Sequence, residues 1–134
     1  MIVLDEELQD PYIVSEITAW YPGKVISVRA LRPRTIIKDE AIVTLLQALA
    51  NPTFVTINVE DFWWVMRADA NICLVCIDLP NARALQVPTW LRKFLRLDMF
   101  KTKAGRMGIV ALLRAKHIEF YRADHKIKTI EWTP

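Results

Sequence analysis

Residues 72–77, Ile-Cys-Leu-Val-Cys-Ile, form an uninterrupted apolar run between Asn71 and Asp78. A run of this length is typical of a strand that is buried on both faces. Met1–Leu4 is a second short apolar run, and it ends at Asp5. Strands of this kind belong to sheets that carry helices on each side, so these stretches favour an α/β fold.

The first run also contains two cysteines, Cys73 and Cys76, in a CxxC spacing. In a strand, residues three apart point to opposite faces and lie about 10 Å apart along the chain. A disulfide needs Cα atoms closer than about 7 Å. We therefore expect two buried core thiols rather than a redox pair or half of a zinc site.

Further elements follow the same alternation along the chain. Strands are expected at residues 1–4, 24–28, 54–57, 72–77 and 108–113, and helices at residues 11–20, 37–50 and 86–99, with one or two helical turns within 60–68. Residues 117–121 and 126–132 alternate with a period of two, as in a hairpin. This order predicts a mainly parallel central sheet with helices on its faces and an antiparallel C-terminal hairpin.

Length and composition indicate one domain over residues 1–134. The chain is 53% hydrophobic, which excludes a disordered protein. No apolar run approaches the ~18 residues of a membrane span. The first residues turn acidic at once, without the basic segment of a secretion signal. We expect a cytoplasmic protein with no membrane partner.

Charge is divided unevenly between the two halves of the chain. Residues 1–82 hold six Lys/Arg and eleven Asp/Glu, a net charge of −5, whereas residues 83–134 hold twelve and four, a net charge of +8. This asymmetry suits a protein that gathers carboxylates at one site and meets an anion with another surface. Ordinary solvated faces would explain it equally well.

Polar residues follow three of the expected strands. Asp5 ends the first strand, Asn58 follows the third, Asp78 follows the fourth, and Asp61 lies three residues past Asn58. Because the carboxyl ends of parallel strands meet at one edge of the sheet, where such folds place their sites, we expect these side chains to lie close together.

The second helix contributes Asp39 and Glu40. On a helical wheel Asp39 shares a face with Ile42 and Leu46, the apolar stripe that must lie on the sheet. Glu40 falls on the opposite, water-facing side. We therefore expect Asp39 to point toward the strand ends, and we interpret Glu40 as a residue that stabilises the helix dipole.

Several carboxylates at one edge would repel one another and raise one another's pKa. Hard divalent cations such as Mg²⁺ or Mn²⁺ take oxygen ligands and relieve that repulsion. The chemistry that such a cluster supports is metal-assisted hydrolysis of a phosphodiester. Other mechanisms fit poorly: the chain has no phosphate-binding glycine motif, and His117 and His125 fall in the hairpin, where we expect surface positions.

Three segments carry a resemblance to a known family: "IVLDEEL" at 2–8, "KDEAI" at 38–42 and "VTINVEDFW" at 55–63. They resemble the "LDENLP", "SDEEIL" and "VTxDxDF" segments of short PIN-like domains found beside bacterial toxin–antitoxin genes. The last is also similar to "TRNVxDF" of PIN-domain toxin ribonucleases. The resemblance covers residues 1 to about 100.

The resemblance implies a PIN-like three-layer domain and cleavage of RNA that depends on Mg²⁺ or Mn²⁺. Asp5, Asp39 and Asp61 would be the metal ligands, and Asn58 would complete the catalytic site. An antitoxin protein and a second copy of the chain are the implied partners. The alternative is a catalytically silent PIN-like module that binds a protein or RNA.

Two departures from the family pattern favour that alternative. The full-length toxins carry a further catalytic glutamate, for which Glu6 or Glu40 would have to substitute here, and Asn58 replaces an aspartate. A receiver-like phosphoacceptor is a third interpretation, but it requires an aspartate where Asn58 stands.

Contacts with RNA are expected from a basic connection and an aromatic pair. Arg29, Arg32 and Arg34 could contact phosphates, and Trp63 could stack on a base. Trp63 and Trp64 are adjacent on a short helix, so we expect one of them to be exposed or at an interface. Packing in a dimer or at the rim would explain the pair as well as base stacking does. A second basic surface, either a phosphate track or a solvated face, is formed by Lys93, Arg96, Lys101, Lys103 and Arg106.

Overall fold

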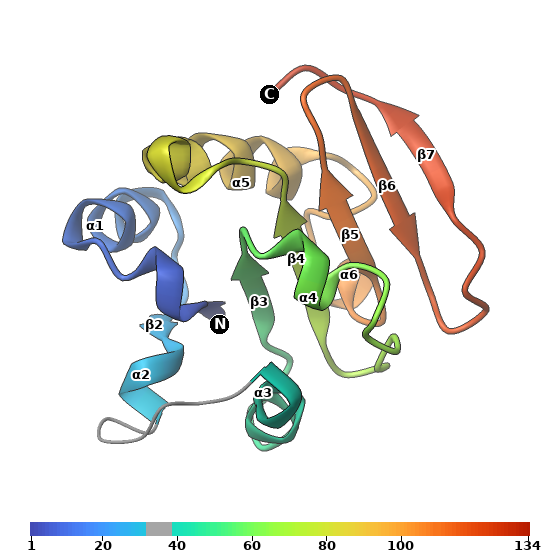
Figure 1. The fold of residues 1–134 in the computed structure, drawn as a ribbon, viewed down its shortest axis with the longest axis horizontal. Coiled ribbons are helices and arrows are strands. Elements are labelled where there is room, and N and C mark those ends of the chain that lie inside the picture. The colour runs from blue at the N-terminus through green and yellow to red at the C-terminus, as the bar shows by residue number, and fades with distance from the viewer. Residues whose placement is uncertain (32–38) are drawn as a thin grey trace.

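The computed structural model describes residues 1–31 and 41–134 in full, and residues 39 and 40 by their backbone. A seven-stranded sheet runs through the molecule in the order β2-β1-β3-β4-β5-β6-β7 (Figure 1). Its first five strands pair in parallel, and β5, β6 and β7 pair antiparallel. The strands are β1 (Ile2–Leu4), β2 (Val25–Ser27), β3 (Thr53–Thr56), β4 (Cys73–Ile77), β5 (Val110–Leu113), β6 (His117–Tyr121) and β7 (Lys128–Glu131).

Helices connect the parallel strands. They are η1 (Glu6–Leu8), α1 (Pro11–Trp20), α2 (Val28–Leu31), α3 (Asp39–Gln47), α4 (Val59–Phe62), η2 (Asn81–Gln86), α5 (Val87–Arg96) and α6 (Lys103–Arg106), η1 and η2 being 3₁₀ helices. Helix α1 begins where its sequence predicts, because the Asp10 side chain accepts a hydrogen bond from the Tyr12 amide at 2.8 Å and Pro11 occupies the first turn.

The sheet is covered on both faces. One core packs α1, through Ile13 and Ile17, and α5, through Leu91 and Phe94, against one face. The other core packs α2, α3 and α4 against the opposite face. Figure 1 shows α1 and α5 beside each other, with α3 and α4 on other parts of the sheet.

The cysteines confirm this two-sided burial. Cys73 belongs to the core under α1 and α5, and Cys76 to the core under α3 and α4. Both are free and buried, and burial raises the pKa of each thiol. Opposite faces of one strand keep them apart, as their spacing predicts.

The strand order creates a special position between β1 and β3. The chain goes from β1 to one neighbour, β2, and then crosses back to the other neighbour, β3. Such a switch point opens a crevice at the carboxyl ends of the two strands, where doubly wound sheets bind ligands. Asp5 directly follows β1, and Asn58 lies two residues after β3.

The predicted α/β class, the mainly parallel sheet and the antiparallel C-terminal hairpin are confirmed. Several boundaries differ. The expected helix at 86–99 is α5 preceded by the separate 3₁₀ turn η2, because Pro88 can occupy a first helical turn but not a helix interior. The connection after β2 begins with a helical turn, α2, and the expected turns within 60–68 shorten to α4.

Within the described residues, no helix is both long enough and apolar enough to cross a membrane. Arg32 and Arg34, together with the expected start of the second helix at 37, lie outside the described residues.

Candidate functional site

Asp5 is the most deeply placed carboxylate at the switch point. Its side chain accepts a hydrogen bond from the Thr56 hydroxyl at 2.6 Å and one from the Glu6 amide at 2.7 Å. The residue is only 5% exposed. Burial raises the pKa of Asp5, the two hydrogen bonds oppose that rise, and the charges of Glu6 and Asp61 add to it. Asp5 is therefore held in one orientation between β1 and β3.

Thr56 links Asp5 to the loop after β3. Its hydroxyl oxygen accepts a hydrogen bond from the Asn58 amide at 2.9 Å while it donates to Asp5. The Asn58 side-chain amide donates in turn to the Asp61 carboxylate at 2.7 Å. Asn58 also caps α4, since its side-chain oxygen accepts from the Asp61 amide at 3.4 Å. A continuous hydrogen-bond chain thus joins Asp5, Thr56, Asn58 and Asp61.

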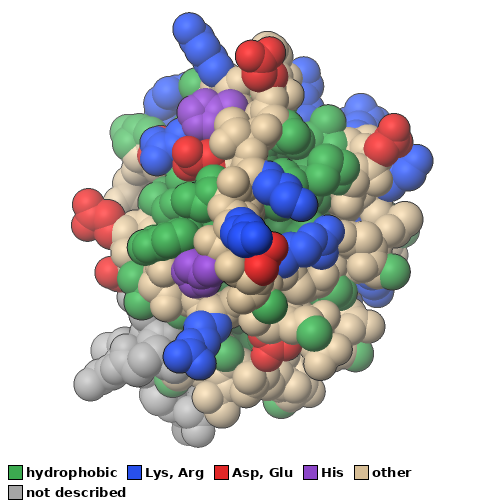
Figure 2. Space-filling view, turned by 90° about the vertical axis from the view of Figure 1, so that its right-hand side faces the viewer, with side chains coloured by type: hydrophobic (Ala, Val, Ile, Leu, Met, Phe, Trp, Pro, Cys, Tyr) green, Lys and Arg blue, Asp and Glu red, His purple; other side chains and the backbone are tan. Residues whose placement is uncertain are grey.

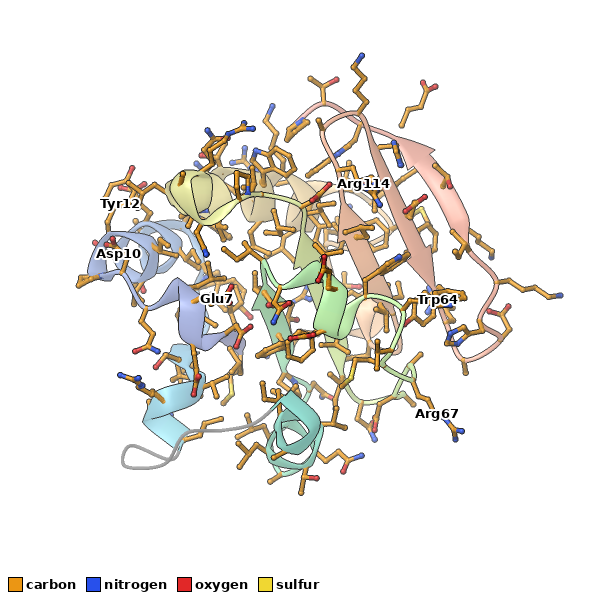
Figure 3. All side chains as sticks on the ribbon, in the orientation of Figure 1. Glu7, Asp10, Tyr12, Trp64, Arg67 and Arg114 are labelled. Atoms are coloured by element: carbon orange, nitrogen blue, oxygen red, sulfur yellow. The ribbon has the colours of Figure 1, made fainter. Side chains whose placement is uncertain are left out.

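Glu7 brings a further carboxylate to this region. It is an exposed residue of η1, and partial burial together with the charges of Asp5 and Asp61 raises its pKa. Figure 3 shows Glu7 on the inner side of the N-terminal segment, whereas Asp10 and Tyr12 lie at its outer edge. Glu7 has no role in the sequence interpretation, because one acidic residue among three in a row gives no sign of its direction.

A hollow of about 350 Å³ lies next to these groups, at the carboxyl ends of β3 and β4. Within the described part of the chain, its lining includes three acidic side chains and no basic one: Glu7, Glu60 and Asp78. Asn58 contributes to the same wall. An acidic wall of this kind suits a cation more than a bare anion.

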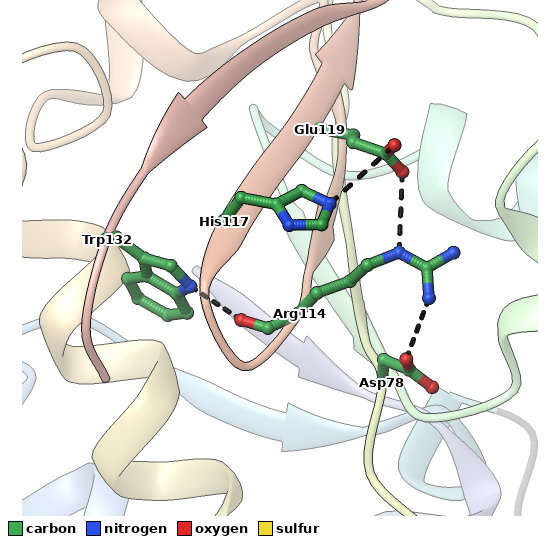
Figure 4. A network of polar contacts seen from close by, with 5 residues as sticks. All are labelled: Asp78, Arg114, His117, Glu119 and Trp132. Carbon is green, nitrogen blue, oxygen red and sulfur yellow. Dashed lines mark hydrogen bonds and ion pairs between the residues drawn. The ribbon is translucent and has the colours of Figure 1, made fainter.

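Asp78 is engaged elsewhere, in the polar network of Figure 4. Its carboxylate pairs with Arg114 at 3.0 Å, and the Arg114 Nε lies 3.5 Å from a Glu119 oxygen. His117 Nε2 lies 3.7 Å from the other Glu119 oxygen, and the Trp132 indole donates to the Arg114 carbonyl at 2.6 Å. Arg114 therefore neutralises Asp78 at the rim of the hollow.

The aromatic pair, Trp63 and Trp64, directly follows α4. Trp63 is half-buried against Tyr121, with ring centroids 5.1 Å apart, and the Tyr121 hydroxyl donates to the Trp63 carbonyl at 2.6 Å. Trp64 is 49% exposed and meets the His125 ring at 4.4 Å, so the expectation of one exposed tryptophan is confirmed. Figure 2 shows the face of the β6–β7 hairpin, where hydrophobic side chains lie among basic ones and histidines.

The structure brings Asp5, Asn58 and Asp61 together, as strand ends predict, and it adds Thr56 and Glu7. Asp39 begins α3, but its side chain lies outside the described residues, as does that of Glu40. Arg29 is exposed on α2.

Among the described side chains, no group of three His, Cys, Asp or Glu is arranged to hold a metal ion. The predicted ligand set of Asp5, Asp39 and Asp61 extends beyond that part of the chain. The oxygen donors that are described, two carboxylates and an amide, are of the type that Mg²⁺ and Mn²⁺ prefer.

No family model, curated protein or solved structure matches this chain.

Proposed function

We propose that this protein is a PIN-like, metal-dependent ribonuclease that hydrolyses RNA phosphodiester bonds. The observation that carries the proposal is the hydrogen-bond chain from Asp5 through Thr56 to Asn58 and Asp61 at the β1/β3 switch point. It fixes two carboxylates and an amide at the carboxyl ends of the parallel strands, where doubly wound sheets bind their ligands.

Asp5, Asp39 and Asp61 would hold Mg²⁺ or Mn²⁺. When bound, such an ion supplies Lewis-acid stabilisation of the phosphate and lowers the pKa of a water molecule. The carboxylate oxygens at this edge are suitable ligands for such an ion. Burial, and then repulsion from neighbouring carboxylates, raises the pKa values of Asp5 and Glu7, and a bound cation would relieve that repulsion. Each Asp5 side-chain oxygen accepts one hydrogen bond from the described residues, which leaves lone pairs for a ligand bond.

The chain's own residues would orient these ligands and the substrate. Thr56 fixes the rotamer of Asp5, and the Asn58 side-chain amide fixes that of Asp61. Arg29, Arg32, Arg34 and the Trp63–Trp64 pair would contact the RNA, as phosphate and base partners. In this proposal the protein acts in the cytoplasm as a toxin, with an antitoxin protein as its partner and a homodimer as its assembly.

The test is cleavage of a mixed-sequence RNA with Mn²⁺, compared with the same reaction in EDTA. We expect wild type to cleave only with the metal, and Asp5→Asn and Asp39→Asn to abolish cleavage without unfolding the protein. Glu16→Gln is the matched control, because Glu16 is an exposed residue of α1 with no part in the site. Cleavage by both aspartate variants at the wild-type rate would overturn the assignment.

A specific observation favours a second candidate, the catalytically silent module. Asp5 is almost fully buried, and both of its carboxylate oxygens already accept hydrogen bonds. This candidate predicts RNA or protein binding that persists in EDTA, falls with salt and involves no turnover. RNA binding without cleavage in Mn²⁺ would favour it over the nuclease.

A further inference from the structure

A second hollow, of about 510 Å³, lies at the opposite end of the sheet. Three segments line it: the end of α1 with the turn that follows, the second half of α5, and the region around α6. Its lining residues are Trp20, Tyr21, Pro22, Gly23, Arg92, Leu95, Arg96, Lys101, Lys103 and Arg106. We call it the basic hollow.

The basic hollow is strongly cationic. Five of its lining residues are Lys or Arg, and none of the described lining residues is acidic. Lys101 pairs with Asp98 at 3.1 Å, an exposed contact whose acidic partner is not a lining residue. Arg92, Arg96 and Lys103 make no ion pair with a carboxylate among the described residues. The field inside the hollow is therefore positive and attracts anions.

Arg106 is the feature that separates this hollow from an ordinary solvated basic face. The residue is 3% exposed and has no carboxylate partner in the described chain. Its Nε donates to the Thr53 hydroxyl at 2.9 Å, and its Nη1 donates to the Phe100 carbonyl at 3.2 Å. A buried guanidinium without a counter-ion is costly, so its burial points to an anion that compensates it.

Among the described contacts, one nitrogen of Arg106 is left for such an anion. Nη2 donates to none of the described residues. Every fully buried side-chain N or O atom in the described chain has a hydrogen-bond partner. Nη2 must therefore be reached by solvent, and Arg106 reaches solvent where it lines the basic hollow.

Aromatic side chains form another wall of the hollow. The Arg92 guanidinium lies 6.0 Å from the Trp20 ring, and the Trp20 and Tyr21 rings meet edge to face at 6.3 Å. Trp20 is partly buried against the core and also lines the hollow, and nucleic-acid bases stack on aromatic rings of this kind. The wall therefore offers a surface for a planar ring beside the cationic groups.

We propose that the basic hollow binds a nucleotide, with its phosphates on Arg96, Lys103 and Arg106 and its base against Trp20. The volume falls within the range of small-molecule sites, roughly 300–1,000 Å³. Cationic groups and an aromatic ring in one hollow of this size match the phosphates and the base of a single nucleotide.

The basic hollow does not depend on the proposed nuclease. Arg106 contacts Thr53 at the start of β3, whereas Asp5 contacts Thr56 at its end. These two threonines lie about 10 Å apart along the strand. The carboxylate site and the basic hollow are therefore separate, and either assignment can fail without the other.

The experiment is calorimetric titration of the full chain with ADP in low salt, with pyrophosphate and adenosine titrated separately. We expect saturable ADP binding that is tighter than either fragment, because both the cations and the rings contribute. Arg92→Gln and Arg96→Gln each remove a charged group of the hollow and should weaken ADP binding roughly tenfold. Both residues are exposed, so these variants should fold.

Lys93→Gln is the matched control, since Lys93 is an exposed residue of the same helix that does not line the hollow. Its ADP affinity should stay within about twofold of wild type. Absence of saturable ADP binding by folded wild type would overturn the proposal, as would an equal loss in Lys93→Gln. Pyrophosphate binding as tightly as ADP would overturn the role of Trp20, and RNA displacing ADP at lower concentration would identify a strand rather than a nucleotide.

Discussion

The two ends of the parallel sheet carry opposite chemistry on the same strand. At the carboxyl end of β3, Thr56 holds the Asp5 carboxylate, and at the amino end Thr53 holds the Arg106 guanidinium. Both charged groups are at least 95% buried and both depend on a threonine hydroxyl. One four-residue strand thus fixes two buried charges of opposite sign, one at each of its ends.

The same contrast accounts for the charge asymmetry of the chain. Asp5, Asn58 and Asp61 come from the acidic first half, and all five cations of the basic hollow come from residues 92–106 in the basic second half. Charge segregation along the sequence thus becomes segregation between the ends of the sheet.

The largest expected effect is a loss of RNA cleavage that leaves ADP binding unchanged. Asp5→Asn removes the charge of a proposed metal ligand at the carboxyl end, so RNA cleavage should fall at least ~100-fold while ADP affinity stays at the wild-type value. Cleavage assays and ADP calorimetry on one preparation give both readouts. A matched loss of ADP binding would show that the two ends are one site or that the fold has been lost.

A smaller effect is expected from the threonine pair. Thr56→Val removes the hydroxyl that orients Asp5 and should lower cleavage roughly tenfold with ADP binding retained. Thr53→Val removes the partner of Arg106 and should weaken ADP binding to a similar degree with cleavage retained. Each should also cost about 1–3 kcal/mol of stability, measured by urea unfolding, since a buried partner loses its hydrogen bond.

If each threonine variant lowers both RNA cleavage and ADP affinity, the two ends of the sheet do not act independently. Equal losses that only follow the loss of stability would show that the hydroxyls support the fold and position neither charge.

The smallest effect is expected at the rim. Arg114 pairs with Asp78 and Glu119, but all three side chains are between a quarter and a half exposed. Arg114→Gln should therefore lower stability by less than about 1 kcal/mol in urea unfolding and leave ADP binding unchanged. A loss of several kcal/mol would contradict this view and make the network of Figure 4 a structural centre.

The sequence predicts the β6 bounds, residues 117–121, because strict alternation leaves little freedom in a hairpin strand. It also predicts that Asp5 and Asn58 meet, since both follow parallel strands. The sequence does not predict that Thr56 orients Asp5, because a threonine within an apolar strand gives no sign of which side chain its hydroxyl contacts.

The basic hollow is harder to predict from the sequence than the carboxylate site. The sequence shows the cluster of basic residues, but it does not predict α6, a four-residue helix that is too short to show an amphipathic pattern. The Thr102 side chain caps this helix by accepting a hydrogen bond from the Gly105 amide at 3.0 Å. Burial of Arg106 depends on how that short helix meets Thr53, which is 53 residues away in sequence, and on the Phe100 carbonyl, which is only six residues away. Such a meeting follows from tertiary packing, not from any local pattern.

The most direct test of the central claim, a carboxylate site for a divalent cation at the switch point, is a Mn²⁺ titration by calorimetry. Wild type and Asp39→Asn are compared at equal concentration, with folding checked by circular dichroism. We expect saturable binding at micromolar to sub-millimolar strength in wild type and its loss in the variant. No saturable binding by folded wild type, or equal binding by both proteins, would contradict it.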